Sequence, residues 1–238
     1  MLAREQLAPH VVVLVVQAPR VALKRRPGQF VIVRLHDGAE RIPLTIADAD
    51  PDAGTITLVI QSVGKSTTDL CALRQGDSIR DVAGPLGRPT DLLDVGHAVC
   101  VGGGVGTAVV LPIARALAER GVQVTSVVGA RSASLLLLVE QLRKAGDVIV
   151  CTDDGSEGRT GVVSEALAEL VVAGHVDAVY AVGPVPMMQA CAEVTRPLQI
   201  PTTVSLNSIM VDGTGMCGGC RVSVGGRTQY ACVDGPEF

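Results

Sequence analysis

The chain has 238 residues, enough for two domains or three small ones, each with its own core. Its charges nearly cancel at a net of -4, which disfavours binding to nucleic acid or to an anionic membrane surface. The chain shows no secretory leader pattern, so its seven cysteines are expected in the reducing cytoplasm rather than in disulfides.

The first part of the chain, residues 1–95, predicts an antiparallel β-barrel or sandwich. Short runs of β-branched and apolar residues alternate there with clusters of Pro, Gly and Asp, which are turn signals. The predicted strands are 11–16, 30–35, 41–46, 55–62 and 78–82.

The next part, residues 96–206, predicts a doubly wound parallel sheet, because apolar strands alternate with helical segments. The predicted strands are 98–101, 122–128, 147–151, 176–182 and 201–206. The predicted helices run from a glycine loop to about residue 119 and then over 133–145, 161–172 and 186–195. A third segment, residues 207–238, follows directly and predicts a small hairpin around 221–231.

A glycine loop, Gly102-Gly103-Gly104-Val105-Gly106-Thr107, lies between the first parallel strand and its helix. Backbone amides at such a helix start can hold a pyrophosphate. The match to the dinucleotide fingerprint is imperfect, because Thr107 takes the third glycine position and the next strand ends at Arg131 without an acidic residue. A purely structural glycine turn therefore stays open as an alternative.

Two more strand ends support a nucleotide site. Asp153-Asp154-Gly155 follows the third parallel strand, and Gly183-Pro184 follows the fourth. Ligands of open parallel sheets bind where the carboxyl ends of the strands meet. The predicted nucleotide-binding residues are Gly102, Gly103, Gly104, Gly106, Thr107, Arg131, Asp153, Asp154, Gly155, Gly183 and Pro184.

Four residues near the end of the chain, Asp212, Cys217, Cys220 and Cys232, have the spacing of a plant-type ferredoxin ligand set with a carboxylate at the first position. The glycines between them allow a tight loop, and the hairpin returns the chain to deliver Cys232. This pattern predicts a 2Fe-2S cluster. Three thiolates and an oxygen also suit zinc, so a zinc site and a hairpin with incidental cysteines stay open.

Four motifs in the first domain carry a family resemblance. Pro27-Gly28-Gln29-Phe30, Arg41-Ile42-Pro43-Leu44-Thr45, Gly64-Lys65-Ser66-Thr67 and Gly84-Pro85-Leu86-Gly87 resemble motifs of the ferredoxin-NADP reductase superfamily. With the cluster segment, the chain looks most like two groups. One is the electron-transfer subunit of dihydroorotate dehydrogenase. The other is the small subunit of NADH-dependent reduced ferredoxin:NADP oxidoreductase, also known as a sulfide dehydrogenase subunit, and Asp212 in place of a cysteine resembles this second group.

The resemblance implies an FAD on the barrel. It places Arg41, Pro43, Leu44 and Thr45 along the cofactor, with Thr45 near flavin N5 as the catalytic residue. It places Gly64, Lys65, Ser66 and Thr67 at the diphosphate. Two departures are plain: Arg41 lies one residue earlier than in the usual Arg-x-Tyr-Ser motif, and Leu44 replaces the aromatic residue.

The resemblance also implies a function, an electron-transfer flavoprotein subunit that uses FAD, a 2Fe-2S cluster and NAD(H) or NADP(H). Its partners would be ferredoxin and a larger flavin and iron-sulfur subunit similar to the small subunit of glutamate synthase, in an assembly capable of electron bifurcation. Two alternatives remain. One is the electron-transfer subunit of a dihydroorotate or sulfide dehydrogenase, and the other is a zinc-stabilised binding module without catalytic function.

Overall fold

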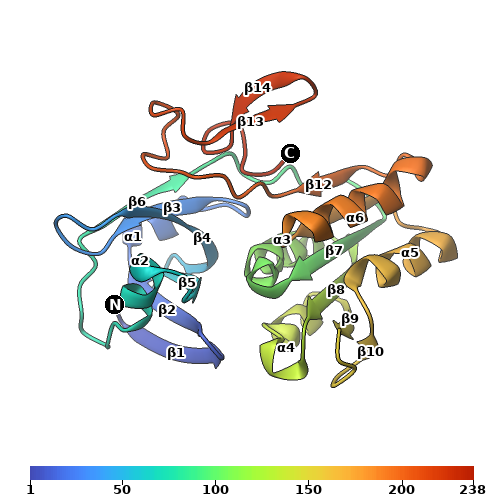
Figure 1. Ribbon diagram of the computed structural model, residues 1–238, viewed down its shortest axis with the longest axis horizontal. Coiled ribbons are helices and arrows are strands. Elements are labelled where there is room, and N and C mark those ends of the chain that lie inside the picture. Colours follow the sequence, from blue (N-terminus) through green and yellow to red (C-terminus); the bar gives the residue numbers. More distant parts are fainter. The chain divides into compact units, whose positions relative to one another are not determined.

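The computed structural model describes residues 1–238 and divides them into two units (Figure 1). The first unit contains residues 1–90 together with 206–238, and the second contains 91–205. The predicted cluster segment, 207–238, therefore folds within the same unit as the N-terminal strands.

The first unit is built on a six-stranded antiparallel sheet with the strand order β1-β2-β5-β4-β3-β6. Alternate residues of its strands, such as Val12, Leu14 and Val16, are buried in one core together with the short helices α1 and α2. This alternation is what a sheet with one buried face requires. The elements are β1 (Ala3–Ala8), β2 (Val11–Gln17), α1 (Pro19–Ala22), β3 (Phe30–Arg34), β4 (Arg41–Asp50), β5 (Thr55–Gln61), α2 (Lys65–Cys71) and β6 (Asp81–Leu86).

Two strands at the edges of this sheet differ from the prediction. Strand β1, with the sequence Ala-Arg-Glu-Gln-Leu-Ala, was not predicted because it is polar and mostly exposed, as an edge strand can be. The strand predicted at 78–82 is instead β6, Asp81–Leu86, which contains Gly84 and Pro85. Proline is tolerated there because β6 pairs with β3 alone.

Strand β4 changes its partner halfway along its length. Arg41 to Thr45 pair with β3, whereas the residues from Ile46 onward pair with β5. The register shifts between Ile46 and Asp48, which marks a β-bulge. The bend therefore lies directly after Thr45, the residue predicted to face the flavin.

The second unit is a six-stranded parallel sheet with the order β10-β9-β8-β7-β11-β12. The chain builds outward from β7 in one direction and then returns to add β11 and β12 on the other side, so β7 and β11 flank the topological switch point. The elements are β7 (His97–Gly103), α3 (Thr107–Glu119), β8 (Gln123–Ala130), α4 (Val139–Arg143), β9 (Asp147–Thr152), β10 (Arg159–Thr160), α5 (Val163–Ala173), β11 (Ala178–Val182), α6 (Val185–Thr195) and β12 (Thr202–Val204), with 3-10 turns at Gly104–Gly106, Ala133–Leu135 and Arg196–Leu198.

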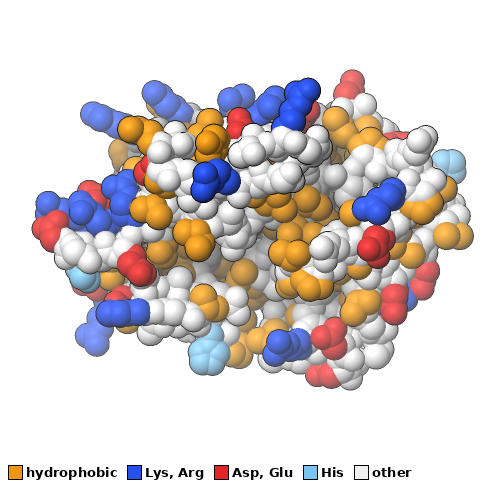
Figure 2. All heavy atoms as spheres, turned by 45° about the horizontal axis from the view of Figure 1, so that its top comes forward, with side chains coloured by type: hydrophobic (Ala, Val, Ile, Leu, Met, Phe, Trp, Pro, Cys, Tyr) orange, Lys and Arg blue, Asp and Glu red, His pale blue; other side chains and the backbone are white.

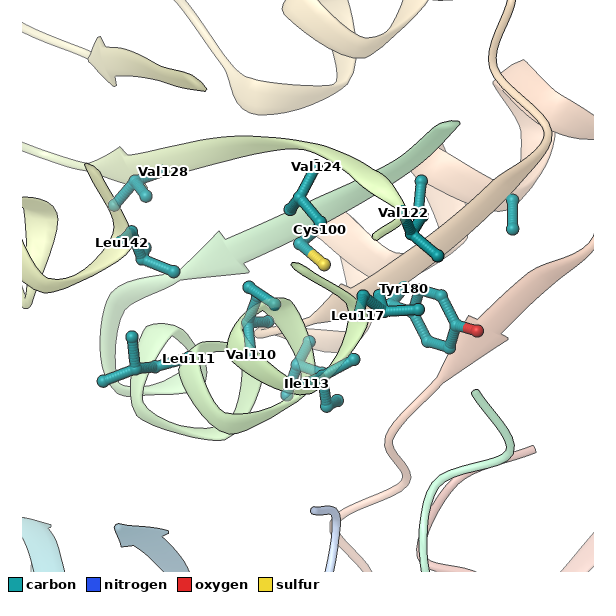
Figure 3. Packing of buried hydrophobic residues seen from close by; sticks show 14 residues of the cluster. Cys100, Val110, Leu111, Ile113, Leu117, Val122, Val124, Val128, Leu142 and Tyr180 are labelled. Carbon is teal, nitrogen blue, oxygen red and sulfur yellow. The ribbon is translucent and has the colours of Figure 1, made fainter. Parts of the chain in front are cut away.

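Helices cover both faces of this sheet. The strands are apolar throughout, as burial of both faces requires. On β7, Ala98 and Cys100 pack in the core formed with α3 and α4, whereas Val99 and Val101 pack in the core formed with α5 and α6. Figure 3 shows the first of these cores, in which Cys100 lies among aliphatic side chains. The helix predicted at 133–145 is wrong in extent: it contains only a 3-10 turn and α4, since Leu138 between them has a left-handed backbone with φ 57.

The C-terminal segment contains a two-stranded antiparallel hairpin, β13 (Arg221–Val224) and β14 (Arg227–Tyr230). Gly225 and Gly226 form its turn with φ values of 56 and 76, the two positive values that a type I′ turn needs. The predicted fold class, an antiparallel barrel-type sheet, a doubly wound parallel sheet and a C-terminal hairpin, is confirmed. No helix is long and apolar enough to span a bilayer.

Candidate functional site

The loop from Asp212 to Cys220 is held together by the Asp212 carboxylate. Its Oδ1 accepts a hydrogen bond from the Thr214 backbone N–H and its Oδ2 accepts one from the Cys217 N–H, both at 2.7 Å. The Thr214 bond, followed by the Cys217 bond, lowers the pKa of Asp212 below its usual value. Asp212 is therefore an ionised oxygen donor fixed beside the backbone of the first predicted thiolate ligand.

Cys220 and Cys232 lie side by side at the base of the hairpin. Their sulfur atoms are 3.1 Å apart, and the two residues are only 1% and 2% exposed. Burial, and then the neighbouring Cys220 thiol, raise the pKa of Cys232 to about 12. The Cys232 side chain is thus a thiol in the metal-free protein, and a bound metal would have to displace its proton.

The four predicted ligands are brought onto one loop and hairpin but do not converge on one point. Cys217 is exposed, whereas Cys220 and Cys232 are buried, and no group of three His, Cys, Asp or Glu side chains has the geometry of a formed metal site. The donor set nevertheless fits an iron-sulfur cluster. It offers two adjacent thiols, a third thiol and an ionised carboxylate on a glycine-rich loop.

The outer face of the antiparallel sheet supports the cluster segment. Phe30 and Ile32 of β3 pack in one apolar cluster with Met210, Cys220, Ala231 and Cys232. On the neighbouring strand, Thr45 pairs directly with Phe30, and Pro43 pairs with Ile32. Residues opposite each other in an antiparallel pair share a face of the sheet. Pro43 and Thr45 therefore lie next to Ile32 and Phe30, the two residues that pack against the cysteines.

The predicted flavin residues of β4 separate onto two faces. Ile42, Leu44 and Ile46 pack toward the barrel core, so Arg41, Pro43 and Thr45 occupy the outer face. The Leu44 side chain thus packs on the barrel core, and only its backbone lies along the outer face that was predicted to hold the cofactor. Of the outer three residues, Arg41 is exposed and the other two are half-buried.

The predicted diphosphate loop forms the start of helix α2, with Gly64 at its N-cap. The Thr67 hydroxyl accepts hydrogen bonds from the backbone N–H groups of Val63 and Gly64 at 3.0 Å. Lys65 is paired with Asp69, and Ser66 donates to Glu40. These side chains also line a cavity of about 200 Å³ whose apolar wall includes Val33, Leu35, Ile42 and Leu70.

The predicted nucleotide residues lie at the carboxyl ends of the parallel strands, where β7, β8, β9 and β11 end in register. The loops after β8 and β9 are joined: Asp153 N–H donates to the Ala130 carbonyl and Asp154 N–H to the Arg131 carbonyl, both at 3.2 Å. Hydrogen bonds from Ser156 lower the pKa of Asp154. The ionised Asp154 carboxylate therefore stabilises the conformation of this loop.

The glycine loop after β7 packs closely on the end of β11. A Cβ at Gly106 would lie 2.2 Å from the Val182 carbonyl oxygen, and a Cβ at Gly103 would lie 2.5 Å from the Met187 sulfur. Both distances are far below van der Waals contact. At Gly106 the clash is with backbone atoms, so that position admits only glycine, whereas at Gly103 the flexible Met187 side chain would have to move. The sequence did not single out Met187, because its contact with Gly103 depends on the pairing of β7 with β11.

Replacing Gly106 with alanine should destabilise the protein by about 2 kcal/mol, because the Val182 backbone cannot move aside without distorting β11. Urea denaturation measures this loss. Gly104→Ala in the same loop is the control, since nothing lies within 4 Å of that Cβ and only its φ of 54 is unfavourable. It should cost about 1 kcal/mol. Equal losses for the two variants would contradict the close packing at Gly106.

Comparison with known proteins identifies the relatives. Residues 207–238 match the model of the iron-sulfur cluster binding domain of dihydroorotate dehydrogenase B. A dihydroorotate dehydrogenase B (NAD(+)) electron transfer subunit homolog from Thermotoga maritima is 49% identical over 223 residues, which cover 94% of this chain and 79% of that protein. The corresponding electron transfer subunit of Bacillus caldolyticus is 37% identical over 90% of this chain and 85% of its own.

Solved structures are also similar to this chain. An NADH-dependent reduced ferredoxin-NADP oxidoreductase, studied for flavin-based electron bifurcation, is 45% identical with a TM-score of 0.95, covering 100% of this chain and 86% of that one. An Amycolatopsis cytochrome P450 reductase, at 23% identity and a TM-score of 0.69 over 84% of this chain and 67% of its own, shares the fold. The chain belongs to the family of dihydroorotate dehydrogenase B electron transfer subunits and their homologues, within the ferredoxin reductase-like fold.

Proposed function

We propose that this chain is the electron-transfer subunit of an oxidoreductase complex, with FAD, a 2Fe-2S cluster and a nicotinamide nucleotide as its cofactors. When bound, FAD exchanges a hydride with the nicotinamide and single electrons with the cluster. The residues of this chain bind and orient the three groups. No acid-base pair among them is required for that chemistry.

The observation that carries this proposal is the shared outer face of β3 and β4. Phe30 and Ile32 support Cys220 and Cys232, while their cross-strand partners Thr45 and Pro43 lie on the same face, one strand away. Neighbouring strands are about 5 Å apart. A flavin along β4 would therefore lie beside the cluster segment, within the same unit of the protein.

In this proposal the four ligands of the cluster are Asp212, Cys217, Cys220 and Cys232. The outer face of β4 holds the flavin ring through Arg41, Pro43, Thr45 and the Leu44 backbone, and Gly64, Lys65, Ser66 and Thr67 hold the diphosphate. The strand-end loops of the second unit hold the nicotinamide nucleotide. The joined loops at Arg131 and Asp153 to Ser156 support a preformed nucleotide edge.

The chain functions as part of a complex with a larger partner subunit, and the cluster loop offers a surface for it. Ile209, Val211, Met216 and Val233 are 78%, 50%, 89% and 47% exposed, and Cys217 is exposed among them. Figure 2, which brings this side forward, shows hydrophobic and basic side chains close together. We propose a larger flavin and iron-sulfur subunit, similar to the glutamate synthase small subunit, as the partner on this surface, with ferredoxin as the external carrier.

An anaerobic visible spectrum, with iron, sulfide and flavin assays, tests the proposal. We expect one flavin and about two irons per chain, with bleaching when NADH or NADPH is added separately. The nucleotide that bleaches the spectrum identifies the donor. A colourless protein that holds zinc after anaerobic cluster reconstitution would overturn the redox function.

The second candidate is the electron-transfer subunit of a dihydroorotate dehydrogenase, which the cluster-domain match favours. The two candidates differ in the partner, so co-purification of the native complex separates them. A partner that oxidises dihydroorotate supports the second. A partner with its own flavin and further iron-sulfur clusters supports the ferredoxin:NADP transhydrogenase assembly.

Asp212→Cys should change the EPR signal and the midpoint potential of the cluster, because a thiolate is a softer ligand than a carboxylate. Asp234→Asn is the matched control, since this neighbouring acid accepts a hydrogen bond from the Tyr230 N–H and is outside the ligand set. EPR-monitored redox titration measures both variants. An Asp212→Cys protein with the wild-type signal and potential would show that Asp212 is not a ligand.

A further inference from the structure

Arg25 reaches from the segment after α1 to the backbone of β4. Its backbone N–H donates to the Val21 carbonyl of α1 at 2.9 Å, which fixes the start of the side chain. Its Nη2 donates to the Ile46 carbonyl at 3.1 Å and to the Ala47 carbonyl at 3.4 Å. One guanidinium therefore holds two consecutive peptide groups of β4.

These two peptide groups lie where β4 changes its partner strand. The β-bulge falls between Ile46 and Asp48, so the regular ladder is interrupted there. Ile46 and Ala47 are 0% and 2% exposed, and buried carbonyls without a donor are costly. The Arg25 guanidinium donates hydrogen bonds to both of these buried carbonyls.

Gln29 is also hydrogen-bonded to β4 at Ile46. The Ile46 N–H donates to the Gln29 carbonyl at 3.1 Å, and the Gln29 Nε2 donates to the Gly87 carbonyl at 2.9 Å. Its Oε1 accepts from the Arg26 N–H at 3.0 Å. Gln29 is 8% exposed, so this polar network is built into the interior of the fold.

We propose that Arg25 is a positioning residue for flavin reduction: it fixes the β4 bulge and thereby holds Thr45 in register against the flavin ring. The inference rests on the proposed function, because it places the flavin on the outer face of β4. Thr45 immediately precedes Ile46, so a shift of the Ile46 peptide moves the Thr45 carbonyl and side chain with it. Displacements of about 1 Å cost reaction rate even when binding is preserved.

The neighbouring Arg26 provides a matched control. It is exposed, and only its backbone N–H enters the network. Arg26→Gln removes the same charge one residue away and leaves the Gln29 contacts in place. Arg25→Met keeps the approximate length of the side chain and removes the Nη2 group that donates both hydrogen bonds. Arg25→Lys keeps the positive charge but replaces the planar guanidinium with a single flexible point donor.

The test is stopped-flow reduction of the flavin-loaded variants by NADH, with hydrogen exchange of the peptides covering residues 44–49 as a second measurement. For Arg25→Met we expect a rate of flavin reduction at saturating NADH that is lower by about tenfold, with the NADH dissociation constant within about twofold of wild type. Hydrogen exchange at residues 44–49 should be faster in Arg25→Met. Arg26→Gln should match the wild type in the rate of flavin reduction, the NADH dissociation constant and the exchange rate.

Arg25→Lys keeps the test decisive if Arg25→Met does not fold. It should reduce the flavin about threefold more slowly than the wild type, with faster exchange at 44–49. An unchanged rate per bound flavin in the folded Arg25 variants overturns the proposal, even if their melting temperatures fall. A wild-type protein that takes up no flavin overturns the proposed function as well, which distinguishes the two failures.

Discussion

The Cys220→Ala protein should purify with flavin and without iron. Cys220 is one of two buried cysteines whose sulfur atoms are 3.1 Å apart, so its loss leaves Cys232 as the single thiol at the base of the hairpin. We expect iron to fall from about two atoms per chain to near zero, since a 2Fe-2S cluster needs four protein ligands. Iron and sulfide assays with the visible spectrum measure the loss.

Cys191→Ala is the control for this substitution. Cys191 is also fully buried, but it lies in the core between α6 and the parallel sheet, and burial alone raises the pKa of its thiol to about 11. Its replacement should leave iron, sulfide and flavin unchanged. A Cys220→Ala protein that keeps its iron and its spectrum would contradict the ligand assignment, and so would a loss of iron in Cys191→Ala.

The fold was largely predictable because its strands carry strong local signals. The strands of the parallel sheet are apolar on both faces, and those of the barrel alternate, so β7 and β2 were found within a few residues of their ends. Strand β1 was missed because an exposed edge strand has no hydrophobic pattern. Helix α4 was overextended because the left-handed turn at Leu138 has no glycine to mark it.

The sequence pattern of the proposed cluster segment is more local than the contacts around the proposed flavin and nucleotide sites. The spacing of Asp212, Cys217, Cys220 and Cys232 lies within one short stretch, whereas Arg25 meets Ile46 and Gly103 meets Met187 only after strands distant in sequence have paired. Such contacts depend on register and on a β-bulge. Neither property is encoded in a local motif.

Glu237 is a buried acid that no motif predicted. Both of its carboxylate oxygens are buried without a hydrogen-bond donor, and a Cβ at Gly28 would lie 3.0 Å from each of them. Burial raises the pKa of Glu237 to about 7. The nearby Thr90 hydroxyl offsets only part of that rise.

This carboxyl lies in a short segment that is hydrogen-bonded to both stretches of the first unit. The Arg88 N–H donates to the Gly235 carbonyl at 2.6 Å, and the Leu206 N–H donates to the Pro236 carbonyl at 2.8 Å. Residues 88–90 end the first stretch of this unit, and Leu206 begins its second. Glu237 thus directly follows two residues whose carbonyls accept hydrogen bonds from both stretches of the first unit.

Glu237→Gln should stabilise the protein at pH 8 and have little effect at pH 4.5. The folded protein holds the proton up to about pH 7, whereas the unfolded chain releases it near its ordinary pKa of 4.5. The unfolded state thus binds fewer protons between these values, so the wild-type free energy of unfolding falls as pH rises through this window. The free energy of unfolding falls by about 3 kcal/mol over this window, and glutamine, which does not ionise, avoids this fall.

Urea denaturation of both proteins at pH 4.5 and pH 8 measures this difference, and the gain should appear as a higher midpoint at pH 8. Glu193→Gln on α6 is the matched control, because Glu193 is exposed and its replacement removes the same charge. It should not reproduce the gain. An equal stabilisation by Glu237→Gln at both pH values would mean that packing of the amide, and not the proton on a buried carboxyl, accounts for the effect.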